Sequence, residues 1–93
     1  MATLSENKLD LGNGGGMSAP YCTNLADYFT AMNTMTVAWV YSQNAQDAPQ
    51  IQMSWTLIMK SDNANYGYMF WFGTGAIYCR FLNNGTWGNW TQC

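Results

Sequence analysis

The stretch Tyr66–Trp90, YGYMFWFGTGAIYCRFLNNGTWGNW, packs nine aromatic residues into about a quarter of a 93-residue chain. Aromatic residues favour strands, and the glycines between them mark tight connections. Asn84–Gly85 suits a type I′ hairpin turn, because both central residues of that turn need a positive φ. The stretch therefore predicts antiparallel strands with large aromatic faces, which make either a core or a surface for a partner.

Alternation within this stretch places bulky side chains on both sides of the sheet. The two sets are Tyr66, Tyr68, Phe70 and Phe72 on one side and Gly67, Met69 and Trp71 on the other. Trp87 and Trp90, three residues apart, point to opposite faces of an extended segment unless a bulge at Gly88 intervenes. We therefore expect both sides to be covered, the aromatic residues being shared between the core and a subunit interface.

The preceding residues predict one short helix and further strands. Asn24, with Asp27 three residues later, is typical of a helix N-terminus, and apolar residues follow at helical spacing within 24–33. Strands are predicted over Met35–Ser42, Gln52–Lys60, Tyr66–Phe72, Ala76–Leu82 and Thr86–Gln92. The fold class is therefore mainly β: a small antiparallel β-meander or sandwich with one short N-terminal helix.

The composition indicates a subunit of an assembly. Apolar residues make up 48% of the chain and charged residues only 9%, where an ordinary soluble domain has roughly 25% charged residues. A net charge of -2 gives little repulsion between copies. We expect a single domain over 21–93 whose charge-poor surface is largely hidden in an oligomer.

The charge pattern excludes several partners. The three cations, Lys8, Lys60 and Arg80, are too few and too scattered to neutralise a run of phosphates, so nucleic-acid binding is not expected. No run of 18 apolar residues occurs, so membrane insertion is not expected either. The sequence begins without a secretory signal pattern, which predicts synthesis in a cytoplasm.

The sequence lacks a typical set of catalytic residues. The chain has no histidine, the commonest general base and metal ligand. A glycosidase pair drawn from Asp27, Asp47 and Asp62 is conceivable, but carboxylates in turns and helix starts usually cap or are solvated. We expect no enzyme and no cofactor.

Three cysteines, Cys22, Cys79 and Cys93, occur without a C-x-x-C pair, which argues against a zinc site. Two alternatives remain for them. Either Cys22 and Cys79 form a bridge in an oxidising medium, or the cysteines are buried free thiols.

Residues 1–20 differ from the rest of the chain. The glycine-rich run at 12–16 has the composition of a flexible linker, and Leu4, Leu9 and Leu11 precede it. One interpretation is a frayed terminus or the remnant of a tag. The other is an attachment arm whose leucines dock on a neighbouring protein while the domain stays mobile.

Arg80 is the single charge within the aromatic stretch, and alternation places it on the same strand face as Tyr78 and Leu82. It is either a solvated arginine stacked on an aromatic neighbour, or a hydrogen-bonding group beside a stacking platform for a sugar. Trp87 and Trp90 likewise suit either a sugar ring or a buried contact.

The C-terminal half resembles the ending of pyocin-knob-type domains, small modules of phage and phage-like tail fibres. The matching pieces, in order, are Tyr78-x-Arg80, Asn83-Asn84-Gly85 and Trp87-Gly88-Asn89-Trp90-Thr91-Gln92. Earlier pieces also match, so that the resemblance covers roughly 24–92; these are Asn24–Asp27, Val37–Ser42, Asn44–Pro49 and Trp55–Met59. The chain departs from the pattern at Met35-Thr36-Val37 and in its extra aromatic residues at 70–72.

The resemblance implies a virion structural protein: a homotrimeric knob of a head or tail fibre that attaches to the bacterial surface. Its arm would bind other virion proteins. Tyr78, Arg80, Asn84, Trp87 and Trp90 are then fold, interface or ligand-binding positions, a surface glycan being a candidate ligand. We expect recognition at the polar turns 43–49, 61–65 and 83–85. The alternative is a stand-alone carbohydrate-binding module that stacks sugars on tryptophans.

Overall fold

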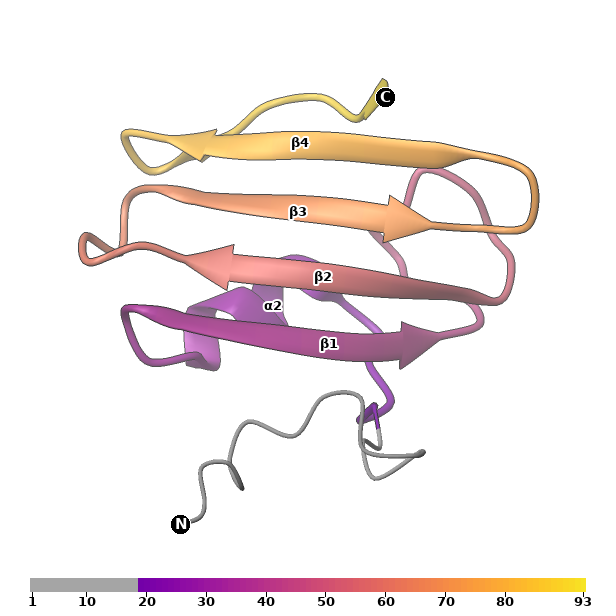
Figure 1. Ribbon diagram of the computed structural model, residues 1–93, viewed down its shortest axis with the longest axis horizontal. Coiled ribbons are helices and arrows are strands. Elements are labelled where there is room, and N and C mark those ends of the chain that lie inside the picture. Colours follow the sequence, from indigo (N-terminus) through magenta and orange to yellow (C-terminus); the bar gives the residue numbers. More distant parts are fainter. Residues whose placement is uncertain (1–18) are drawn as a thin grey trace, which may run out of the picture.

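In the computed structural model, residues 19–93 form one antiparallel sheet with a short helix on one side (Figure 1). Its elements are α2 (Leu25–Ala31), β1 (Thr36–Ser42), β2 (Ser54–Lys60), β3 (Gly67–Phe72), β4 (Ile77–Asn83), β5 (Thr86–Trp87) and β6 (Thr91–Gln92). The prediction of a mainly β fold with one short helix is confirmed. The expected attachment arm, with Leu4, Leu9 and Leu11, lies outside the residues that the structure describes.

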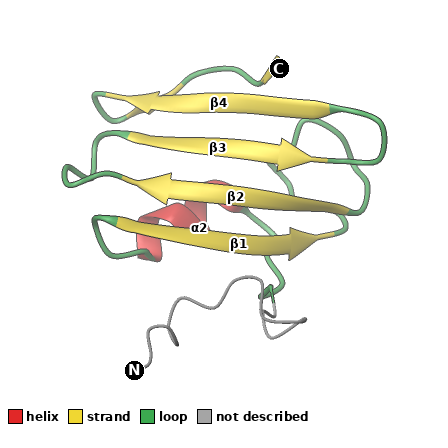
Figure 2. Ribbon diagram, in the orientation of Figure 1, coloured by secondary structure: helices red, strands yellow, loops and turns green. Residues whose placement is uncertain are grey.

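The strands follow one another as a meander. The sheet order is β1-β2-β3-β4-β5, and β6 also pairs with β4. Figure 2 shows α2 behind β1 and β2, so that the second layer in this part of the chain is a helix and not a second sheet. The last predicted strand is interrupted: β5 and β6 are separated by residues 88–90.

The predicted helix start is confirmed. The Asn24 side chain accepts a hydrogen bond of 2.9 Å from the backbone N–H of Asp27, as an N-cap does. The helix is shorter than predicted, because the backbone turns to an extended conformation at Met32. Leu25 and Phe29 are its buried residues, and they face the sheet.

The C-terminal end of α2 is held by a lysine from the sheet. Lys60 is 7% exposed, and its Nζ donates to the carbonyl oxygens of Phe29 (3.0 Å), Thr30 (3.3 Å) and Met32 (2.7 Å). The Phe29 carbonyl also accepts from the N–H of Met32 (3.0 Å), and the three carbonyls lie at the negative end of the helix dipole. A cation at this position therefore satisfies them, and β2 must keep its lysine on the helix side.

The core lies between α2 and one face of the sheet. It contains Leu25 and Phe29 of the helix and, from the strands, Val40, Ile58, Met69, Trp71 and Leu82. Strand β2 buries its more polar side, Ser54, Thr56, Ile58 and Lys60, and turns Trp55, Leu57 and Met59 away from the helix. Alternation separated these two sets correctly, but hydrophobicity alone would have selected the wrong set for the core.

Within the single chain only one side of residues 66–72 is covered, and the expected subunit interface over the other side stays a prediction. Met69 and Trp71 are fully buried, whereas Tyr66 and Tyr68 are 40% and 44% exposed. The physical reason is that one helix covers only one side of a four-stranded meander. The other side needs a further layer to bury its aromatic residues.

We predict that Gly67→Ala destabilises the fold by about 1–3 kcal/mol, through overpacking. A Cβ at this position would lie 2.2 Å from Cε2 of Phe29 and 2.8 Å from the carbonyl oxygen of Met59. Gly88→Ala is the matched control, because its nearest neighbour lies 3.6 Å away, and we expect a change within about 0.5 kcal/mol. Urea unfolding of both variants measures the difference; equal midpoints would contradict the close packing of α2 on β3.

Candidate functional site

Four of the predicted site residues come together on the helix side of the sheet. Tyr78 and Arg80 are on β4, Trp87 is on β5, and Trp90 lies in the link to β6. The guanidinium carbon of Arg80 lies 4.7 Å from the ring centroid of each tryptophan. Both indoles reach the same arginine because the chain leaves the strand after Trp87, where the N–H of Gly88 donates to the carbonyl of Phe81 (2.9 Å).

Asp47, from the loop between β1 and β2, completes this group. Its Oδ2 accepts from Nη2 of Arg80 at 2.8 Å. Its Oδ1 and Oδ2 also accept from the backbone N–H groups of Leu25 (2.7 Å) and Ala26 (2.8 Å), and its backbone carbonyl accepts from Nε1 of Trp90 (2.7 Å). We call Asp47, Arg80, Trp87 and Trp90 the Asp47 cluster.

Asp47 thus caps α2 from outside the helix and pairs with a buried cation. The sequence left open whether this carboxylate caps a helix or is solvated, and sequence reasoning missed its contact with Arg80. The only signal was its position in the Asn44–Pro49 loop, because its partners lie 21 to 43 residues away along the chain. Spacing does not reveal such contacts.

Arg80 is a buried structural cation and not a solvated one. Its side chain is 10% exposed, and burial lowers the pKa of its guanidinium, while Asp47 acts in the opposite direction. Arginine still keeps its charge at any physiological pH, because its ordinary pKa is so high. Both indoles and a carboxylate surround this charge, so the stacking part of the prediction is confirmed and the solvation part is wrong.

Tyr78 and Asn84 have local structural roles. The Tyr78 ring packs edge-on against Trp71, and its hydroxyl accepts from Nε2 of Gln50 (3.2 Å). Asn84 (φ 53°) and Gly85 (φ 85°) form the turn between β4 and β5, which confirms the predicted pair of positive φ angles.

Two of the three predicted recognition turns lie side by side. The N–H of Gly85 donates to the carbonyl of Asn65 at 3.0 Å, which joins turns 61–65 and 83–85 at the left end of Figure 1. The loop over 43–49 is elsewhere: it crosses the helix side of the sheet, where Ala45 is buried and Asp47 meets β4. Only the turns 61–65 and 83–85 form one surface.

The Asp47 cluster connects α2, β4 and the C-terminal segment. Both Asp47 oxygens and one face of each indole are already engaged in contacts within the chain. Within residues 19–93, no group of three metal-ligating side chains gathers. In the same part of the chain, no helix is long and apolar enough to cross a membrane.

The opposite side of the sheet is a second candidate surface, which we call the open face. Cross-strand register arranges it in three rows of four residues, one residue from each of β1 to β4. The rows are Val37, Met59, Tyr68 and Phe81; Trp39, Leu57, Phe70 and Cys79; and Tyr41, Trp55, Phe72 and Ile77. No charged or amide side chain occurs among them, and none of the twelve is buried.

The three cysteines are free thiols in different environments. Cys22 is buried in the core on the helix side, Cys79 is on the open face, and Cys93 is exposed. The sheet separates Cys22 from Cys79, so the alternative of a bridge between them is wrong. The alternative of buried free thiols holds for Cys22.

No protein-family model, curated protein or solved structure matches the chain. The likeness to knob domains therefore remains a resemblance of motifs.

We predict that Asp47→Asn destabilises the domain by about 2–4 kcal/mol. The amide has one acceptor oxygen where the carboxylate has two, so its NH₂ group faces a donor that the carboxylate accepted from, and the buried cation loses its counter-charge. Asp62→Asn removes the same charge from the exposed turn after β2, and we expect a change within about 0.5 kcal/mol. Thermal and urea unfolding compare the two; equal losses would contradict the role of Asp47.

We predict that the native protein reacts with a thiol reagent at Cys93 first and at Cys22 only after unfolding. Burial raises the pKa of the Cys22 thiol, so at pH 8 little of it is the reactive thiolate. Cys93 is exposed, although hydrogen bonding with Cys79 raises its pKa as well. Mass spectrometry of time-resolved labelling gives the order, and fast labelling of native Cys22 would contradict the core position.

Proposed function

We propose that this chain is a virion structural protein, the knob subunit of a phage fibre or spike. In this proposal it is a homotrimer that attaches to the bacterial surface, while its N-terminal arm binds other virion proteins. The observation that carries the proposal is the convergence of the motif residues. Arg80 of the Tyr78-x-Arg80 piece packs between Trp87 and Trp90 in the Asp47 cluster, while Tyr78 packs beside it against Trp71.

The surface chemistry supports an assembly subunit. The open face carries twelve uncharged and mainly apolar residues, whereas an isolated soluble protein rarely leaves such a large contiguous patch in water. Fibre subunits bury such faces against one another. A free-standing monomer would expose all of it.

The joined turns 61–65 and 83–85 are the best candidates for contact with a receptor. They present exposed side chains rich in amides, among them Asn63, Asn65, Asn83 and Asn84. Amides donate and accept hydrogen bonds, as recognition of a polar glycan requires. The tryptophan-platform alternative has less support, because Arg80 occupies one face of both indoles.

The proposal predicts a trimer that binds bacterial cells. Sedimentation gives the mass, and fluorescently labelled protein incubated with a panel of bacteria gives cell binding, with purified surface polysaccharide as competitor. Asn84→Gly removes an amide from the turn but tolerates its positive φ, so we expect roughly tenfold weaker cell binding with the trimer intact. Gln46→Ala, on the exposed part of the other loop, is the control and should bind normally.

A stable monomer at micromolar concentration would contradict the trimeric knob. A trimer that binds none of the bacteria, nor their polysaccharides, would contradict the role in attachment and leave an assembly role alone.

A further inference from the structure

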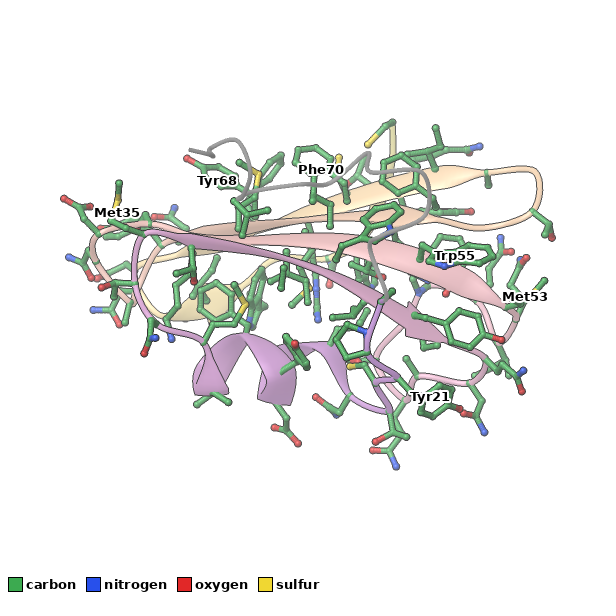
Figure 3. The ribbon with its side chains drawn as sticks, turned by 60° about the horizontal axis from the view of Figure 1, so that its bottom comes forward. Tyr21, Met35, Met53, Trp55, Tyr68 and Phe70 are labelled. Atoms are coloured by element: carbon green, nitrogen blue, oxygen red, sulfur yellow. The ribbon has the colours of Figure 1, made fainter. Side chains whose placement is uncertain are left out.

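The open face exposes apolar side chains that no element within residues 19–93 covers. Figure 3 shows Tyr68 and Phe70 on the side of the sheet away from the helix, and Trp55 near the N-terminal end of β2. Strands β1 and β4 contribute Val37, which is 60% exposed, Phe81 at 49% and Ile77 at 44%. The two middle strands contribute Trp55 at 36% and Tyr68 at 44%.

We propose that other copies of this chain cover the open face, so that the subunit interface is built from the outward side of β1 to β4. This inference rests on the homotrimer of the proposed function and assigns a surface to it. In a ring of three, each face contacts both neighbours around the axis. The joined turns at the end of the sheet then stay free.

The size of the face suits such an interface. Four strands spaced about 4.8 Å apart, with seven residues rising about 3.3 Å each, outline an area of roughly 20 by 20 Å. Covering five residues that are 36–60% exposed, together with seven half-buried neighbours, removes of the order of 800 Å² from water on each subunit, divided between its two neighbours. One protein loses a similar total area in a stable interface of standard size.

The chemistry of the face favours another copy over a polar ligand. A glycan or a charged peptide needs hydrogen-bonding or ionic partners, and the face offers only the hydroxyls of Tyr41 and Tyr68 and the N–H groups of two tryptophans. The hydroxyl of Tyr41 already accepts from Gln43. The cations Lys60 and Arg80 lie on the helix side. An equally apolar face is the complement, and a second copy supplies one.

The chain's own N-terminal segment is a poorer cover. Besides its methionines, residues 1–18 contain only Leu4, Leu9 and Leu11 as bulky apolar residues. Three leucines bury far less apolar surface than the twelve outward residues that another copy supplies. A truncation beginning at Ala19 tests this occupant directly.

The experiment introduces two lysines on the face. Tyr68 and Phe81 are neighbours in one row, with rings 5.8 Å apart, and both are exposed enough for a lysine to stay in water in a monomer. The double variant Tyr68→Lys/Phe81→Lys is compared with Ala31→Lys/Gln46→Lys. The latter makes the same charge change at exposed positions on the helix side. Near-ultraviolet circular dichroism and thermal unfolding confirm that both variants are folded.

Sedimentation of the full chain, both variants and the truncation gives the outcome, with cell binding measured in parallel. We expect the full chain, the control and the truncation to be trimeric. The face variant should dissociate at least roughly 100-fold more readily, because buried unpaired charges oppose association. If the face variant does not fold, the single variant Phe81→Lys replaces it.

Two results would overturn the inference. A face variant that stays trimeric moves the interface elsewhere but leaves the proposed function standing. If the full chain is monomeric and the truncated chain self-associates, the chain's own N-terminal segment covers the face. Failure of the attachment function has a separate signature. In that case the full chain is trimeric and the face variant dissociates as expected, but the full chain binds no cells.

Discussion

The carboxylate of Asp47 is the interaction on which the rest of the structure depends. It accepts hydrogen bonds from the first two N–H groups of α2 and from Arg80. The backbone carbonyl of Asp47 accepts one more, from Nε1 of Trp90. One residue in a loop thereby fixes the helix, the fourth strand and the C-terminal segment relative to one another. A helix of seven residues has no stability of its own in water, so such external contacts are what keep it formed.

The need to satisfy both ends of α2 explains an unusual distribution of polarity. Asp47 lies at the positive end of the helix dipole and Lys60 at the negative end. Both charged groups, with Arg80, therefore occupy the covered side of the sheet, whereas the twelve residues of the open side carry no charge. Within residues 19–93, the buried side-chain polar atoms without a hydrogen-bond partner are Thr56 Oγ1, Trp71 Nε1 and Arg80 Nε. The apolar groups of the open face have no cover within the same residues.

This division suggests how the chain combines its proposed tasks. The covered side stabilises the subunit, the open face joins subunits, and the joined turns over 61–65 and 83–85 present amides beyond the sheet. The three surfaces share few residues. Changes in the turns can therefore alter recognition without disturbing either the core or the assembly.

The sequence by itself determined the local features: the N-cap at Asn24, the meander, the turn at Asn84–Gly85 and the two alternating sets of each strand. These follow from neighbouring residues, whose conformational preferences act within a few positions. Only the tertiary structure decided which set is buried, that Asp47 meets Arg80, and that Trp87 and Trp90 share one side. Those outcomes depend on packing between separate elements, including contacts between residues up to 43 positions apart, which neither composition nor periodicity encodes.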